Sequence, residues 1–136
     1  MPKKTQHYQL NQWEAGDSFL RADFNEDNTK LEAALERLET AKCQAVFGSF
    51  IGDGTSGRSI SLGLTPKAVL LVGGSGQTYT NGDTYGGLFT TQQPLKSGNN
   101  TVAAQISEGG FTVSYLPRDN CYVNCDSDSF HYAAFC

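Results

Sequence analysis

Charged residues and glycines are divided very unevenly along this 136-residue chain, and that division most constrains its fold. Residues 1–43 hold six Lys/Arg and eight Asp/Glu, whereas the remaining 93 residues hold four and six. Glycine follows the opposite trend, with Gly16 in the first part and the other 14 in the second. Because glycine disfavours helices and marks turns, we predict a helical segment followed by a turn-rich one, with the boundary near residues 42–45.

The overall charge and the N-terminal residues exclude several classes of protein. A formal net charge of -4 repels phosphate backbones, so nucleic acid is not an expected partner. The longest aliphatic run, residues 68–72, is far shorter than the roughly 20 residues of a membrane span, so we expect a soluble protein without membrane contact. Residues 1–4 are basic but residues 5–9 are polar, which argues against a signal peptide and for folding in a reducing cytoplasm.

The first part carries the pattern of a long helix over residues 23–43. Asp23 and Glu26, three residues apart, form the acidic version of a capping box and predict the start of the helix. Residues at spacings of four and three then follow: Phe24, Asn28, Leu31, Leu35, Leu38 and Lys42. This is the spacing of a coiled-coil seam, and the other faces are highly charged, so the helix is expected to associate with copies of itself in a homotrimer.

Two features of this helical pattern have alternative interpretations. The apolar stripe could instead lie across the C-terminal sheet, because two and a half heptads make a short pattern. Asn28 could set the register of a coiled coil, or it could lie in water in a frayed first turn. Both alternatives stay open at the level of sequence.

The second part consists of short segments with the pattern of β-strands. Phe111, Val113 and Tyr115 alternate with neighbours that face the other way, as in half-buried strands. The candidate strands are residues 46–51, 58–63, 67–73, 77–80, 87–90, 101–107, 110–116, 121–123 and 130–135. Turn pairs suited to positive φ lie between them: Asp53-Gly54, Asn81-Gly82, Asn99-Asn100 and Gly109-Gly110. We therefore predict an α+β protein in which residues 44–136 form an antiparallel β-sandwich or jelly-roll-like tip domain.

The chain has no recognisable catalytic motif, so an enzyme is not expected. Its two histidines are His7, in a polar N-terminal arm, and His131, in a candidate strand, and neither lies in a nucleophile motif. We interpret His131 as a strand or interface residue rather than a general base or metal ligand. We interpret the dispersed carboxylates as solvated turn residues rather than a glycosidase pair; they are Asp53, Asp83, Glu108 and Asp119.

Two loops begin like ligand-binding loops but lack essential residues. Residues 73–76 are Gly-Gly-Ser-Gly after the most apolar strand, but the Gly-Lys-Ser/Thr of a phosphate loop does not follow. Residues 126–129 are Asp-Ser-Asp-Ser, as at the start of a calcium loop, but the later Gly and bidentate Glu are missing. We therefore expect no metal and no cofactor.

The four cysteines allow three interpretations. Reduced, buried thiols are the favoured one for Cys43, Cys121, Cys125 and Cys136. A disulfide between Cys121 and Cys125, or between Cys43 and Cys136, could form after release from the cell. Together with His131 the cysteines could also be written as a zinc set, although they are scattered over different predicted elements.

Several motifs together cover most of the chain. In the first part they are Leu10-Asn11-Gln12-Trp13-Glu14, Asp17, Leu20-Arg21, residues 23–28, Lys30 and Ala33-Ala34-Leu35. In the second part they are Gly52-Asp53-Gly54, Arg58, Ile60, Leu62-Gly63, residues 65–70, Gly86-Gly87-Leu88, residues 110–113 and His131-Tyr132. With these motifs the chain resembles the tail-fibre and related tail proteins of bacteriophages and prophages of Gram-positive hosts. The cysteines at 121, 125 and 136 lie outside the family pattern.

The resemblance implies a virion structural protein, usually trimeric, with its N-terminus attached to the particle and its C-terminal β-domain facing the host. Such a protein is assembled in the bacterial cytoplasm and located in the virion, and its partners are itself and other tail or baseplate proteins. A short receptor-binding tail fibre is the favoured function. The alternatives are a purely structural virion component, such as a head fibre or baseplate decoration protein, and, third, a wall-glycan hydrolase.

Two sets of residues are candidates for these contacts. The arm over residues 1–22 contains the sole tryptophan, which is costly to expose. We interpret its apolar residues as a virion anchor, with folding back onto the helix as the alternative: Leu10, Trp13, Phe19 and Leu20. In the β-domain, aromatic and polar loop residues are suited to stacking on and hydrogen bonding to a host-surface glycan: Tyr79, Tyr85, Arg118, Tyr122, Asp126 and Asp128.

Overall fold

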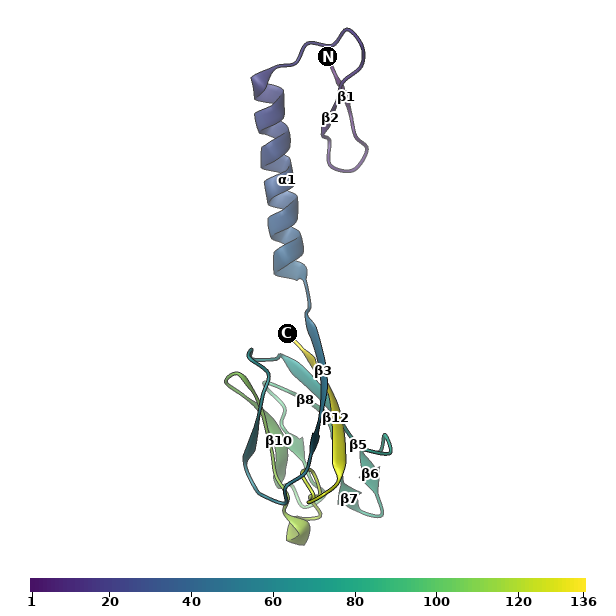
Figure 1. The fold of residues 1–136 in the computed structure, drawn as a ribbon, viewed down its shortest axis with the longest axis vertical. Helices are drawn as coiled ribbons and strands as arrows, with labels where there is room; N and C mark the ends of the chain where they lie inside the picture. Colours follow the sequence, from purple (N-terminus) through teal and green to yellow (C-terminus); the bar gives the residue numbers. More distant parts are fainter. The chain divides into compact units, whose positions relative to one another are not determined.

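The computed structural model describes residues 1–136 as two compact units, Met1–Lys42 and Cys43–Cys136. The first unit contains two short strands, β1 (Lys3–Lys4) and β2 (Asn11–Gln12), and the helix α1 (Arg21–Ala41). β1 and β2 pair antiparallel, with Lys3 opposite Gln12, and form a small hairpin that sequence patterns did not predict. Figure 1 labels these elements and, in the second unit, β3, β5, β6, β7, β8, β10 and β12.

The helix is present as predicted, but the predicted capping box is wrong. Leu20 is the N-cap residue, its backbone is extended, and no side chain caps the helix. Asp23 therefore lies within the first turn, where a carboxylate interacts favourably with the positive end of the helix. Arg21 and Ala22 are good helix formers, so the helix begins before Asp23. Glu26 forms an ion pair with Lys30 instead of returning to an N-cap residue.

The predicted seam of α1 is open to solvent in the single chain. Its apolar residues are exposed, namely Phe24, Leu31, Leu35 and Leu38. Asp27 and Ala34 are the buried residues of the helix, and they lie on a neighbouring face. No stretch of α1 is both long and apolar enough to span a membrane.

The second unit is built from two four-stranded antiparallel sheets and a small hairpin. One sheet has the order β3-β12-β5-β8, and its strands are β3 (Ala45–Ile51), β12 (Ser129–Phe135), β5 (Ala68–Gly73) and β8 (Gly87–Thr90). The other has the order β4-β11-β10-β9, and its strands are β4 (Arg58–Ser61), β11 (Gly110–Val113), β10 (Val102–Ser107) and β9 (Leu95–Lys96). The hairpin joins β6 (Tyr79–Thr80) to β7 (Asp83–Thr84), and a 3-10 helix, η1, covers Pro117–Asp119. The predicted α+β class, with a helix and antiparallel sheets, is confirmed.

Aromatic side chains fill the space between the two large sheets. Phe111 of β11 is fully buried, and its ring centroid lies 5.8 Å from that of Phe89 in β8 and 5.2 Å from that of Tyr132 in β12. Phe50 of β3 stacks on Phe130 of β12, with 5.2 Å between ring centroids. The ring centroid of Phe111 also lies 6.5 Å from that of Phe50, and because β11 belongs to one sheet and β3, β8 and β12 to the other, the contacts of Phe111 join the sheets across a single core.

Most predicted strands are found within a few residues of their expected bounds, but one is wrong. Residues 121–123 form no strand, since Cys121 makes only isolated bridges to Thr84 and Leu116. Asn120 has a left-handed backbone, with φ of 55°, so the chain turns immediately before the predicted strand. The short strands β7 and β9 were not predicted, because two-residue elements carry no periodicity.

Each of the four predicted turn pairs has positive φ at one residue at least, but only Asn81-Gly82 has it at both. Asp53, Asn99 and Gly110 do not, and Gly110 already belongs to β11. Asn81 and Gly82 connect β6 to β7 with φ of 53° and 92°, the two positive values that a type I′ hairpin requires. Gly109, with φ of 76°, closes the hairpin between β10 and β11, in which Ser107 lies opposite Gly110. These turns fix the register of the strands that follow them.

Candidate functional site

Loops from distant parts of the sequence are tied together at one end of the second unit, opposite the C-terminus (Figure 1). The backbone N–H of Thr84 donates to Asn120 O over 2.9 Å, and that of Tyr122 donates to Thr84 O over 2.8 Å. Tyr85 N donates to Thr78 O over 2.8 Å. The two loop regions that sequence patterns selected for glycan binding, around residues 79–85 and 118–130, therefore form one surface.

Asn124 fixes this surface to the rest of the unit. It is fully buried, and its amide Nδ2 donates to Asp53 Oδ1 over 2.7 Å and to Thr55 O over 3.0 Å. Its Oδ1 accepts a hydrogen bond from Arg58 Nη1 over 3.0 Å. Gly52 is needed beside it, because a Cβ at this position would lie 1.9 Å from Cys125 O. Loop 120–128 is thereby held against the turn that follows β3.

Asp53 is the acidic member of this hydrogen-bonded group, which we call the brace and which consists of Asp53, Thr55, Arg58 and Asn124. Its Oδ1 accepts hydrogen bonds from the Thr55 hydroxyl over 2.6 Å and the Thr55 N–H over 3.0 Å, in addition to that from Asn124. These bonds lower the pKa of Asp53 from its ordinary value of 3.8 to about 2. Arg58 Nε lies 3.4 Å from Asp53 Oδ2, and Arg58 Nη1 also donates to Ile51 O over 2.7 Å. Asp53 is thus an ionised structural carboxylate.

Three tyrosines gather on the braced loops. The ring centroid of Tyr122 lies 5.6 Å from that of Tyr85 and 5.6 Å from that of Tyr115. All three side chains are half-buried, and burial is the main cause that raises the pKa of Tyr85 and of Tyr115. The tyrosine cluster, Tyr85, Tyr115 and Tyr122, thus offers partly exposed aromatic rings that pack against one another at the surface.

A polar cavity of about 350 Å³ lies beside Tyr85. Its other lining residues come from the loop after β5 and from the start of β12, namely Gly73, Gly74, Ser75, Gln77, Asp128, Ser129 and Phe130. The loop and the strand approach closely, because a Cβ on Gly74 would lie 2.2 Å from Ser129 Oγ. A ligand in this cavity would meet hydroxyl, amide and carboxylate groups together with one aromatic ring.

The structure brings only part of the predicted glycan-binding set to this cavity. Tyr85 and Asp128 line it, and the Tyr122 ring lies beside that of Tyr85 in a tilted arrangement. Tyr79 on β6, Arg118 in η1 and Asp126 are exposed on the same loops but do not line the cavity. Sequence reasoning missed the contribution of residues 73–77. Their glycine-rich sequence directly after the most apolar strand was the signal available, and it does not show that residue 129 lies beside them.

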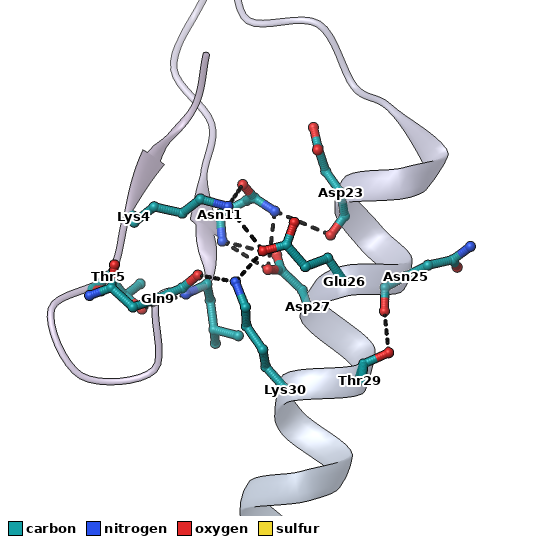
Figure 2. Close-up of polar contacts among 11 residues, drawn as sticks. Lys4, Thr5, Gln9, Asn11, Asp23, Asn25, Glu26, Asp27, Thr29 and Lys30 are labelled. Carbon is teal, nitrogen blue, oxygen red and sulfur yellow. Dashed lines mark hydrogen bonds and ion pairs between the residues drawn. The ribbon is translucent and has the colours of Figure 1, made fainter.

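In the first unit, a buried ion and amide network fastens the N-terminal arm to α1 (Figure 2). The backbone N–H of Asn11 donates to both carboxylate oxygens of Asp27, over 3.1 Å and 3.0 Å. Asn11 Nδ2 donates to Asp27 Oδ1 and to Asp23 O, each over 3.1 Å. Lys4 Nζ donates to Asn11 Oδ1 over 2.6 Å, and Lys30 Nζ donates to Gln9 O over 2.7 Å. Asp27 therefore anchors β2 on the helix.

The predicted virion-anchor residues are divided by this arrangement. The Trp13 ring stacks on Phe24 of α1 with 4.8 Å between ring centroids, and on Phe19 with 5.3 Å. Trp13 thus folds back onto its own helix, which was the alternative interpretation. Leu10 is half-buried, whereas Phe19 and Leu20 are exposed. The Trp13 indole N–H is buried and has no hydrogen-bond acceptor.

All four cysteines are free thiols. Cys121 is buried, its Sγ lies 3.0 Å from Ser114 O, and burial raises its pKa. Burial is also the main cause that raises the pKa of Cys125, whereas Cys43 is exposed. No three His, Cys, Asp or Glu side chains come together as a set of metal ligands, and His131 lies exposed on β12.

Comparison with protein-family models, with curated proteins and with solved structures gave no match for this chain. The function is therefore inferred from the geometry of the chain itself. The strongest candidate site is the polar cavity with its tyrosine cluster, because buried hydrogen bonds hold its loops in place.

Proposed function

We propose that this protein is a phage virion structural protein, a short homotrimeric tail fibre whose second unit binds a glycan on the host surface. The observation that carries the proposal is the convergence of loops 79–85 and 118–130 around Tyr85, Tyr122 and the polar cavity. The resemblance of the chain to tail proteins of phages of Gram-positive hosts supports the same function. On this proposal the protein is assembled in the host cytoplasm and is located in the virion.

The chemistry of the cavity is suited to a saccharide. Sugars present several hydroxyl groups together with an apolar ring face, and they need hydrogen-bonding partners beside an aromatic surface. Ser75, Gln77, Asp128 and Ser129 supply the first, and Tyr85 supplies the second. The volume of about 350 Å³ lies at the small end of ligand-binding cavities. A single site of this size binds weakly, and three copies on one fibre would raise the effective affinity by about 10²–10⁴.

Three features of the chain support three parts of this proposal: self-association, attachment to the particle and the fold of the tip. The exposed residues Leu31, Leu35 and Leu38 have the spacing of a coiled-coil seam and need partner helices. Exposed Phe19 and Leu20 are suited to contact with tail or baseplate proteins at the N-terminus. For the jelly-roll-like tip, the support is that the last strand, β12, returns beside the first, β3, as in a Greek key.

A purely structural virion component is the competing proposal. The exposed apolar surfaces of the chain are as suitable for a head fibre or baseplate decoration protein as for a receptor-binding fibre. A wall-glycan hydrolase is less suitable, because a glycosidase needs a pair of carboxyl groups and Asp128 is the one carboxylate among the residues that line the cavity. Binding to the host surface distinguishes a receptor-binding fibre from a purely structural virion component.

The test uses the full-length chain and a panel of wall polysaccharides purified from Gram-positive bacteria. We expect the wild-type protein to bind at least one of them, and Tyr85→Ala and Tyr122→Ala to weaken binding by about tenfold or more, since each removes a stacking ring. Tyr8→Ala, in the exposed arm, is the control that should bind normally. Asp128→Asn keeps the shape of the cavity and tests the same site if a tyrosine variant fails to fold.

If the wild-type protein binds none of these polysaccharides and does not bind intact cells of the same bacteria, the receptor role is overturned. The protein would then be better described as a structural component of the particle. Equal loss in Tyr8→Ala would show that the cavity is not the binding site.

A further inference from the structure

The outer face of sheet β3-β12-β5-β8 is apolar and uncovered. The strand registers place Phe47, Ala133, Leu70 and Leu88 in one row across all four strands. Three of these side chains are well exposed, Phe47 by 74%, Leu88 by 62% and Leu70 by 42%. None of the four strands contains Lys, Arg, Asp or Glu. An apolar surface of this extent, with His131 as its one titratable side chain from these strands besides Tyr132, marks a contact site.

The pattern of β5 gives the same indication. Its residues 68–72 are Ala-Val-Leu-Leu-Val, so both sides of the strand are apolar. Val69 and Leu71 are fully buried against the core, while Leu70 points to the uncovered side. A continuous apolar run is typical of strands that are covered on both faces, whereas a strand with one face in water alternates.

β3 adds an unprotected edge next to this face. The strand has seven residues, pairs only with β12, and contains neither proline nor a charged residue. Proteins normally protect such edges with lysine, proline or a bulge, because the free N–H and C=O groups otherwise pair with another chain. Exposed Phe47 and Ile51 lie on this edge strand.

We infer that this outer face and the free edge of β3 form an interface with a second copy of the same chain. The face carries both halves of a complementary contact. Phe47 projects at its edge, and a hollow of about 150 Å³ lies among Leu70, Val72, His131, Tyr132 and Ala133. Apolar cavities of about this volume accept a benzene ring, so the Phe47 ring of one copy fits the hollow of the next. A head-to-tail contact of this kind can close into a ring, as the three-fold symmetry of the proposed trimer requires.

A second copy suits this face better than a host glycan does. A glycan needs polar partners, and the four strands offer few. The linker between α1 and β3 consists of Lys42, Cys43 and Gln44, so Ala41 and Ala45 are at most about 14 Å apart. Helices that associate through the seam would therefore hold several copies of β3 at high local concentration. In this respect the inference rests on the proposed self-association.

The experiment measures association of the full-length chain by sedimentation at several concentrations. Phe47→Glu removes the projecting ring and Ala133→Glu places a charge in the hollow. Each should raise the dissociation constant of the assembly by about tenfold or more, a change equivalent to about 1.4 kcal/mol. The control is Thr112→Glu, on the outer face of the other sheet, which should leave it unchanged. Circular dichroism checks that each variant is folded.

A second measurement is hydrogen exchange of the β3 amides in the wild-type assembly and in Leu35→Asp, which disrupts the helix seam. We expect residues 45–51 to exchange more slowly in the assembly. The inference is overturned if Phe47→Glu and Ala133→Glu associate as strongly as the wild type and the β3 amides exchange equally fast in the wild-type assembly and in Leu35→Asp. The fibre would then be held together by its helix alone. A monomeric wild-type protein would overturn both the inference and the proposed trimer.

Discussion

The two large sheets share one core, but their outer faces differ completely. On sheet β4-β11-β10-β9, the outward row consists of Ser59, Thr112 and Gln105, all polar. On sheet β3-β12-β5-β8, the outward row includes the exposed side chains of Phe47, Leu70 and Leu88. The core determines only the inward positions of a strand, so the outward positions report the environment of each face. One sheet is suited to water and the other to a further protein surface.

The largest effect is expected at Phe111, which points into the core between the two sheets. Phe111→Ala removes a fully buried ring that contacts Phe89 and Tyr132, and it should lower the free energy of unfolding by about 3–5 kcal/mol. Thr112→Ala changes the next residue, which points outward, and should stay within about 0.5 kcal/mol of wild type. Denaturant unfolding at a fixed chain concentration measures both. A similar loss in the two variants would show that the two sides of β11 are not distinct environments.

The sequence was sufficient to predict features that depend on local periodicity. The three-four spacing from Phe24 to Leu38 predicted a helix, and alternation around Phe111 and positive-φ pairs such as Asn81-Gly82 predicted strands and hairpins. In the same way, the run at residues 68–72 showed an apolar strand, but it could not show which of its faces remains uncovered in the single chain.

Features that depend on distant residues were missed or misread. The Asn11 and Asp27 contact spans 16 residues and has no local signal, so the attachment of β2 to α1 through it could not be predicted. The polar cavity likewise joins loops 73–77 and 128–130 through strand pairing. Cys121 was assigned to a strand although it follows Asn120, a residue type that tolerates the left-handed backbone found there.

An intermediate effect is expected at Asn124, whose hydrogen bonds hold loop 120–128 in place. Asn124→Ala removes hydrogen bonds to Asp53, Thr55 and Arg58 from a buried site, and should destabilise the fold by about 1–3 kcal/mol beyond its backbone cost. Asn100→Ala is the matched control, because Asn100 also has positive φ, 64° against 78°, but lies exposed in a turn. Its cost of about 1 kcal/mol should reflect the left-handed backbone alone. Equal losses in chemical denaturation would show that the hydrogen bonds of Asn124 add nothing.

The smallest expected effect is a dependence on acid pH, and it tests how the two unlike sheets are joined. Arg58 at the start of β4 donates to Ile51 O at the end of β3, and Asp53 pairs with Arg58. Hydrogen bonds from Thr55 and Asn124 lower the pKa of Asp53 to about 2 from its ordinary 3.8. A group with a lowered folded-state pKa stabilises the fold fully above its unfolded-state value, and that stabilisation is lost as the pH falls through the folded-state value. The contribution of Asp53 should therefore be complete above about pH 4 and should disappear toward pH 2.

The comparison of Asp53→Asn with wild type isolates this contribution. The variant keeps the shape of the side chain but cannot be ionised, so its midpoint of thermal unfolding should fall less steeply between about pH 4 and pH 2 than that of the wild type. Glu108→Gln, in the turn between β10 and β11, removes a carboxylate that has no contact with this brace and should follow the wild-type curve. Parallel curves for wild type and Asp53→Asn would mean that Arg58 and Asn124 hold the two sheets together without help from the charge. In that case the apolar and polar faces would be joined by neutral hydrogen bonds and the shared core alone.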